Sequence, residues 1–133
     1  MINSACPDAI IDEAKFIRKY IDELTGGSPD HARDKYLEYS AFIASDSLGG
    51  KAKFFKAVPM RLYAEPDLKT LKTKYCEELT YQNLNSADLD GLNKLLTKLG
   101  NKTVEYIKTT DRGMHSWNIA DPEELAVWAE KQF

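Results

Sequence analysis

Imidazole chemistry in this chain is limited to two residues, His31 and His115. Imidazole exchanges protons near neutral pH, and in acid–base catalysis a carboxylate commonly orients it. His31 lies in the first turns of a polar predicted helix and is expected to be exposed, whereas His115 lies in a loop after a predicted strand. Two histidines nearly exclude a metal site that needs two or three imidazoles, and no glycine-rich loop suits a phosphate, so we expect no metal and no cofactor.

Two predicted strands position His115 and a carboxylate. Residues 57–64 read as one strand and residues 103–109, rich in β-branched and aromatic side chains, as a second, with a leucine-striped helix over residues 87–99 between them. Strands connected in this way are expected to pair in parallel through a right-handed crossover. Parallel sheets bind ligands beyond the carboxyl ends of their strands. Asp67 follows the first strand and His115 the second, so we expect both at the same rim of the sheet.

The other predicted elements are helical. Apolar residues recur at helical spacing over residues 8–24, and Ser28 is interpreted as the N-cap of a second helix whose first position is a proline. Residues 40–52 are predicted to be a loop and residues 68–79 a short helix. Asp121 caps a closing helix that continues to the end of the chain.

The 133 residues are expected to form a single domain of the α/β class over residues 1–133. Residues 1–52 are expected to form a helical excursion that ends in the loop over residues 40–52, and residues 53–133 have the order strand, helix, strand, helix. Such sheets commonly have about five or six strands, and two strands leave the sheet edges open. Either the first half contains further strands, or something outside the chain completes the sheet. We therefore expect a homo-oligomer such as a dimer, or a missing N-terminal half.

Composition and charge limit the kinds of partner. Apolar residues make up 43% and charged residues 29%, with a formal net charge of −3, which disfavours nucleic-acid binding. No run reaches the ~18 apolar residues of a membrane span, and the first residues lack a secretory signal. We expect a soluble protein that is cytoplasmic by default. Cys6 and Cys76 cannot form a disulfide framework; one bridge is possible, but two free thiols are expected.

Most of the chain resembles the C-terminal part of an α/β-hydrolase of the serine esterase type. Residues 58–67, which end in Glu65-Pro66-Asp67, resemble the late strand that leads to the catalytic acid of that family. Residues 99–117, which end in Gly113-Met114-His115-Ser116-Trp117, resemble the last strand and the histidine loop. Residues 121–133 resemble the closing helix, and the first fifty residues are similar to a helical, lid-like excursion before the acid-bearing strand.

The resemblance implies a triad in the order serine, acid, histidine. Asp67 then matches the acid, and His115 matches the base that takes a proton from a serine hydroxyl and returns it to the leaving group. Asp67 also suits the cap of the helix that follows it. Asp88 is the alternative acid, although a carboxylate in the first turn of a helix is favoured by the helix dipole alone. The implied substrate is a carboxylic ester or a similar acyl compound.

The chain departs from the family at the nucleophile. The family places its serine in a Gly-x-Ser-x-Gly elbow between a strand and a helix, and none of the seven serines here has that context. The sequence therefore predicts a C-terminal fragment of an α/β-hydrolase that is inactive alone, and it leaves open a shortened chain, a split-gene product or a degenerate remnant. The alternative is a non-catalytic module that self-associates or docks on a partner.

Other side chains capable of chemistry have simpler interpretations. Cys76 lies in a helical pattern and is predicted to be a small buried residue rather than a nucleophile. Trp117 and Trp128 are expected to fill the core, with the lining of an acyl pocket as the alternative. Two lysine clusters, at residues 51–56 and 69–74, are expected to be solvated.

Overall fold

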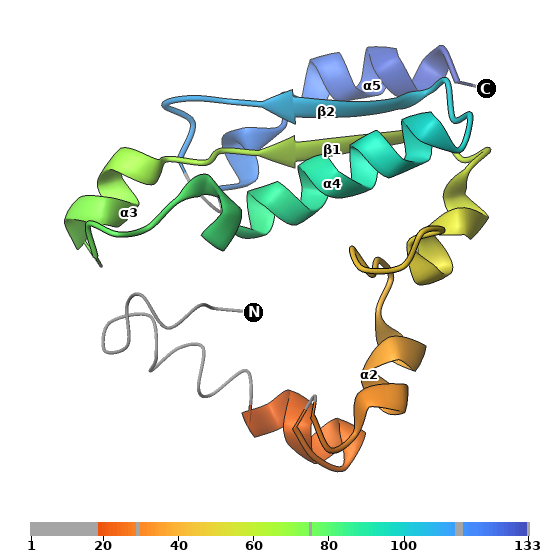
Figure 1. Ribbon diagram of the computed structural model, residues 1–133. Coiled ribbons are helices and arrows are strands. Elements are labelled where there is room, and N and C mark those ends of the chain that lie inside the picture. The colour runs from red at the N-terminus through yellow and green to blue at the C-terminus, as the bar shows by residue number, and fades with distance from the viewer. Residues whose placement is uncertain (1–18, 29, 75, 114–115, 133) are drawn as a thin grey trace.

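The computed structural model describes residues 19–28, 30–74, 76–113 and 116–132. Residues 19–25 are helical, and Figure 1 shows the elements that follow. In chain order these are α2 (Arg33–Tyr39), η1 (Gly50–Phe55), β1 (Met60–Ala64), α3 (Leu68–Lys74), η2 (Tyr81–Asn83), α4 (Asn85–Lys98), β2 (Val104–Lys108), η3 (Trp117–Ile119) and α5 (Pro122–Glu130), where η denotes a 3-10 helix.

The strands β1 and β2 pair in parallel, which confirms the predicted pairing. Met60 lies opposite Val104 at one end of the ladder, and Ala64 lies opposite Lys108 at the other. Within the described part of the chain, these two strands make up the sheet. The α/β class is therefore confirmed, and the first half contributes no further strand among the described residues.

The sheet lies between two helices, as Figure 1 shows. Tyr106 attaches β2 to α4, because its hydroxyl donates a 3.0 Å hydrogen bond to the carbonyl of Ser86. The neighbouring residue Glu105 attaches β2 to α5, because its Oε1 accepts a 3.2 Å hydrogen bond from the indole Nε1 of Trp128. Successive side chains of a strand point to opposite faces. The helices α4 and α5 therefore cover opposite faces of the sheet.

Three predicted boundaries were wrong. The first strand begins at Met60 rather than residue 57, because the Val58 amide still donates to the Phe55 carbonyl in a turn and the following proline has no amide hydrogen. The predicted loop over residues 40–52 gives way to η1 at Gly50. The short helix predicted over residues 68–79 is observed as α3, which ends at Lys74.

The segment before the sheet is helical, but α2 starts later than predicted. Its N-cap is Ala32, without a side-chain hydrogen bond, so the assignment of Ser28 as the cap was wrong. The Ser28 carbonyl instead accepts the amides of His31 and Ala32 in a separate turn. A hydrogen bond from the Tyr36 hydroxyl to Asp22 Oδ1 joins α2 to the helix over residues 19–25.

The buried apolar core of the described residues is small. Leu96 on α4 is fully buried, and it is accompanied by Ala52, Ala64 and Leu79. Gly49 lies against the same core with φ at 68°, and a Cβ at this position would approach Leu95 Cδ2 to 2.2 Å. Both the left-handed backbone and the close approach therefore require glycine here.

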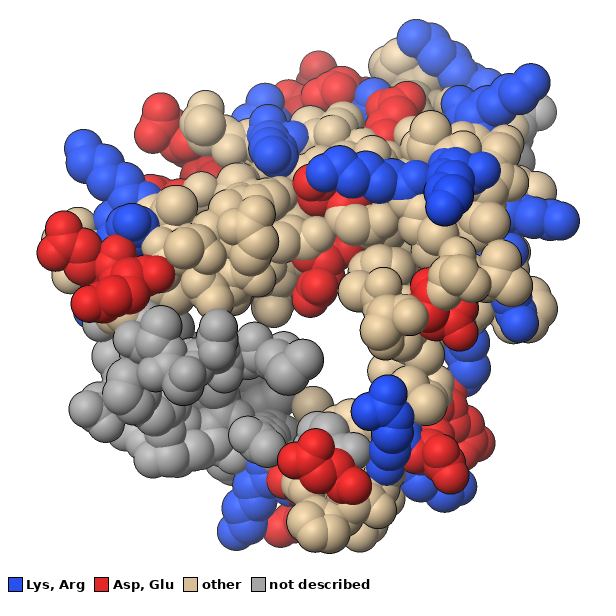
Figure 2. All heavy atoms as spheres, viewed as in Figure 1, with Lys and Arg blue, Asp and Glu red and all other residues tan. Residues whose placement is uncertain are grey.

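Charged side chains of both signs are spread over the surface. Figure 2 shows Lys and Arg side chains interspersed with Asp and Glu side chains on the face in view. A nucleic-acid-binding surface needs an excess of clustered positive charge. This face does not have that character.

Candidate functional site

The candidate site lies at the carboxyl end of the sheet. Because β1 and β2 are parallel, the turn over residues 65–67 and the loop over residues 109–113 leave the sheet at the same end. The Thr109 amide donates a 2.9 Å hydrogen bond to the Ala64 carbonyl, which extends the pairing beyond the strands. The two segments expected to meet at one rim are therefore brought together.

Glu65 is the buried carboxylate of this rim. Its side chain accepts hydrogen bonds from the Thr109 hydroxyl at 2.9 Å, from the Arg112 amide at 3.0 Å and from the Gly113 amide at 2.8 Å. The residue is only 8% exposed. A carboxylate from the end of β1 thus holds the loop that follows β2.

The backbone of this loop is shaped to present its amides. Asp111 has φ at 59° and Gly113 has φ at 91°, so two of three successive residues lie in the left-handed region. Left-handed residues turn successive amides toward one point, which creates a concave site for an anion. Asp111 is the one non-glycine residue with positive φ among the described residues. The anion in this concavity is the Glu65 carboxylate.

Hydrogen bonding keeps Glu65 ionised. Burial alone would raise the pKa of Glu65, and the nearby charge of Asp67 acts in the same direction. Donation from the Gly113 amide, the Thr109 hydroxyl and the Arg112 amide outweighs both effects and lowers the pKa below its ordinary value. The pattern is that of a structural carboxylate rather than a proton donor.

Asp67, the predicted acid, caps α3. Its Oδ1 accepts a 2.9 Å hydrogen bond from the Thr70 amide, and hydrogen bonding from Thr70 lowers the pKa of Asp67. The residue is half-buried. The helix-cap interpretation of Asp67 is confirmed, and its catalytic role stays a prediction.

His115, the predicted base, lies outside the described residues. The structure places its described neighbours instead. Gly113 accepts the Ser116 amide at 2.9 Å through its carbonyl, and the Ser116 Oγ accepts the Asn118 amide at 3.1 Å at the start of η3. The chain on both sides of this position is therefore held by hydrogen bonds.

Asp88, the alternative acid, is exposed in the first turn of α4. Figure 1 shows α4 running in the direction opposite to the strands, so its first turn lies toward the carboxyl end of the sheet. Within the described residues, Asp88 makes no hydrogen bond or ion pair. Its position suits the helix dipole, as expected.

Trp117 does not fill the core, contrary to the expectation. It is 98% exposed at the start of η3, directly after the predicted histidine loop. Trp128 is half-buried, and its indole is hydrogen-bonded to Glu105. The expectation for the two tryptophans therefore holds in part for Trp128 and was wrong for Trp117.

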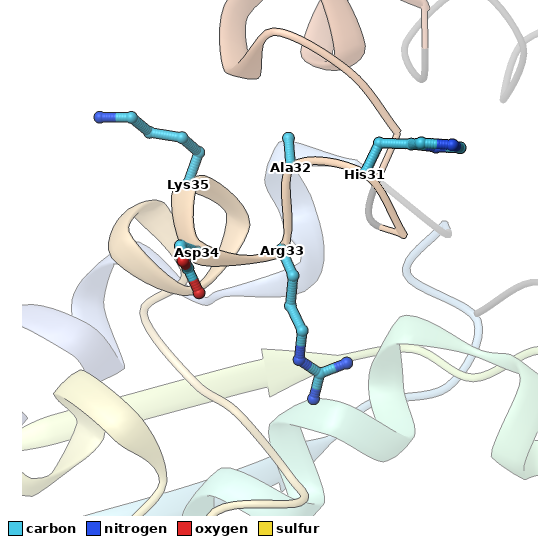
Figure 3. A pocket seen from close by; sticks show the side chains of 5 residues that line it. All are labelled: His31, Ala32, Arg33, Asp34 and Lys35. Atoms are coloured by element: carbon cyan, nitrogen blue, oxygen red, sulfur yellow. The ribbon is translucent and has the colours of Figure 1, made fainter.

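Residues 31–35 line a shallow hollow before and within α2 (Figure 3). The side chains of His31, Arg33 and Lys35 point in different directions from one stretch of backbone and do not converge on a point. His31 is exposed, as expected, and its Nδ1 lies 2.8 Å from the Ser28 Oγ. No carboxylate orients this imidazole among the described residues, so the hollow lacks the parts of a catalytic site.

Cys76 corrects the expectation of free thiols. It is disulfide-bonded and half-buried just beyond α3. The other cysteine of the chain, Cys6, lies outside the described residues.

No group of three His, Cys, Asp or Glu side chains within the described ranges has the arrangement of a metal site. No helix in those ranges is long and apolar enough to span a bilayer.

Sequence reasoning missed Glu65 as a functional residue of this rim. The sequence feature that could have revealed Glu65 is its place directly after a strand, at a position that is buried like the last one of the strand. Its loop partners Arg112 and Gly113, however, bind it through backbone amides, and they lie far away in the sequence.

No protein-family model, curated protein or solved structure matches this chain.

Proposed function

We propose that this chain supplies the acid and the base of an acyl hydrolase, with Asp67 as the acid and His115 as the base. The parallel pairing of β1 and β2 carries the proposal, because it brings the turn with Asp67 and the loop that leads to His115 to one end of the sheet. Residues 53–133 then form the acid- and histidine-bearing part of an α/β-hydrolase-like fold. Residues 1–52 correspond to its lid-like helical segment.

The proposed reaction transfers an acyl group from an ester to water. His115 takes the proton of a serine hydroxyl as its oxygen attacks the ester carbonyl, and it returns that proton to the departing alkoxide. In the second half-reaction water takes the place of the alcohol and gives a proton to His115 as its oxygen attacks the acyl carbon. The bond between that carbon and the serine oxygen then breaks, the proton returns to the serine, and the carboxylic acid is released. Asp67 orients the imidazole and stabilises its positive form through its carboxylate.

The nucleophilic serine and the oxyanion hole are proposed to come from another polypeptide segment. The six serines among the described residues lie in helical turns, in loops or at the start of η3. None of these six lies in a tight turn that joins a strand directly to an α-helix, which is where the nucleophile of such enzymes stands. The strands missing from the sheet would come from the same segment.

The decisive experiment measures hydrolysis of p-nitrophenyl acetate. The full chain is assayed alone and after mixing with any polypeptide that is encoded beside it and carries an elbow serine. We expect activity only in the mixture, and His115→Ala is expected to lower it by at least about 10³-fold. His31→Ala is the matched control, since the exposed His31 lies on the helical segment before the sheet. Undiminished activity of His115→Ala in the mixture contradicts the proposal.

A second candidate function is a non-catalytic module that self-associates or docks on a partner. The open sheet favours it. Hydrogen bonds from the Met60 amide and to the Ala64 carbonyl face β2, so the alternating backbone groups of Arg61 and Tyr63 face away from it. Such an edge is a template for another strand. Association without hydrolysis in every mixture supports this candidate over the first.

A further inference from the structure

We infer that Glu65 is a positioning residue, whose carboxylate fixes the loop that leads to His115 relative to the turn that carries Asp67. The inference rests on the proposed function, because the position of this loop matters to catalysis only if His115 is the base. The resemblance to the hydrolase family gives Glu65 no role, whereas this inference assigns it the role of holding the loop.

The contacts of Glu65 within the described residues are to the loop that follows β2. An ionised carboxylate offers about four lone-pair positions on its two oxygens. Oε1 is approached by the Arg112 and Gly113 amides, and Oε2 by the Arg112 amide and the Thr109 hydroxyl. Three donors of the loop, with the Arg112 amide shared between both oxygens, therefore bind this carboxylate.

The same contacts tie the turn that carries Asp67 to the loop that precedes His115 in the chain. Glu65 is two residues before Asp67, and Gly113, which it holds, is two residues before His115. Within the described residues beyond the strands, the loop is otherwise tied to the turn by one backbone hydrogen bond, from the Thr109 amide to the Ala64 carbonyl. A general base loses efficiency when its position relative to its partners changes by as little as about 1 Å. A fixed loop is therefore required for the proposed triad.

A negative charge is needed because every partner of Glu65 is a donor. A glutamine side chain has nearly the same shape but replaces one oxygen by an NH₂ group, which would face amide hydrogens. Glu65→Gln thus removes both an acceptor and the charge, while it keeps the volume of the buried side chain. Glu77→Gln is the matched control, because Glu77 is exposed in the turn after α3 and makes no contact of this kind.

The test uses nuclear magnetic resonance of the full chain, with two readouts. Hydrogen exchange of the Arg112 and Gly113 amides reports whether the loop is held. The titration of the His115 imidazole reports its surroundings, with His31 as an internal reference in the same spectrum. Because a neighbouring carboxylate favours the imidazolium, we expect His115 to titrate at lower pH in Asp67→Asn than in the unaltered chain.

We expect Glu65→Gln to raise exchange at Arg112 and Gly113 by about tenfold or more and to move the titration of His115 toward that of Asp67→Asn. Glu77→Gln changes neither. If Glu65→Gln does not fold, Gly113→Ala gives a second route, because its φ of 91° and a 3.1 Å approach of the added Cβ to the Ser116 Cβ disturb the same loop.

Two results overturn the inference. Unchanged exchange at Arg112 and Gly113 in Glu65→Gln shows that the carboxylate does not hold the loop. Raised exchange with an unaltered His115 titration shows a purely structural clamp. An Asp67→Asn variant in which His115 titrates as in the unaltered chain instead contradicts the proposed function, and the exchange rates then report the loop alone.

Discussion

A single buried amide, Asn101, joins the segment before β1 to the turn before β2. Its Nδ2 donates to the carbonyls of Phe55 and Val58, each at 2.9 Å, and its Oδ1 accepts the Thr103 amide at 2.8 Å. The residue is 4% exposed. Asn93 on α4 is its opposite, because its buried Oδ1 has no hydrogen-bond partner among the described residues.

This contrast predicts unequal costs for the same substitution. Asn101→Ala removes the side-chain donor of the Val58 carbonyl, the acceptor of the Thr103 amide and one of the two donors to the Phe55 carbonyl, and it is expected to lower the free energy of unfolding by about 2 kcal/mol. Asn93→Ala removes an unsatisfied acceptor and is expected to cost less than about 1 kcal/mol. Urea unfolding of both variants measures the difference. Equal losses would refute this account of Asn101.

The lowered pKa of Glu65 predicts an acid-sensitive loop. A group whose pKa is lower in the folded than in the unfolded state stabilises the fold fully above its unfolded pKa, here about 4.5, and loses that contribution as the pH falls through the folded pKa. The Gly113 amide signal, followed from pH 7 down to about 2, should therefore begin to shift below about 4.5. Glu65→Gln should lack this transition, and one of equal size in that variant would assign it to another group, such as Asp67.

At the residue scale, the sequence predicted the side-chain roles that depend on residues nearby in the chain. Asp67 caps α3 through Thr70, and Asp121 caps α5 through the amides of Glu123 and Glu124, because those donors lie within three residues. The role of Glu65 depends on amides more than forty positions away, and backbone donors carry no signature in the side-chain sequence. Whether the triad residues meet as predicted is left to the experiments above.

Among the elements, α5 is attached to the sheet chiefly by polar contacts. Arg61 Nε donates to Glu105 Oε2 at 2.7 Å, and its Nη1 donates to Glu124 Oε1 at 3.0 Å. The guanidinium carbon lies 5.3 Å from the ring centre of Trp128, a cation–π contact. Leu125 on the same helix is 36% exposed.

Loss of this attachment can be measured by fluorescence. In a Trp117→Phe background, Trp128 is the sole tryptophan, and removal of the 98% exposed Trp117 should not disturb packing. Arg61→Met is expected to shift Trp128 emission to longer wavelength and to increase iodide quenching, because α5 loosens from the sheet. Arg33→Met on α2 is the exposed control. Unchanged emission in Arg61→Met would mean that apolar packing alone holds α5.

Element order and pairing could be predicted because patterns of several residues determine them. The runs around Leu62 and Tyr106 are strand-like, and the leucines of α4 lie between them, so a parallel crossover was the expected solution. The starts of β1 and α2 were missed, since hydrogen bonds within the turns at Val58 and Ser28 decide them. The propensities of the individual residues do not distinguish well between a strand or helix that begins at one residue and one that begins a few residues later.

For the whole molecule, the two-stranded sheet predicts association. Sheets of two strands are marginal, and the outer backbone groups of Arg61 and Tyr63 face away from β2. We expect sedimentation equilibrium to show a mass above that of the monomer as concentration rises. Hydrogen exchange at Tyr63 should slow in parallel, because a covering strand would protect that amide. A monomer at every concentration, with rapid exchange at Tyr63, would contradict this expectation.

Parallel pairing also sets the order of events during synthesis. β2 aligns with β1 at a sequence separation of 44 residues, as in the pair Arg61–Glu105, so β1 leaves the ribosome without its partner. At roughly 5–20 residues per second, translation of the intervening stretch takes about 2–9 s. A nascent chain in which the β1 strand is still unpaired is a substrate for chaperones throughout that interval. Codon usage between the segments that encode β1 and β2 therefore affects the yield of folded protein, because slower translation there prolongs the time that β1 stays unpaired.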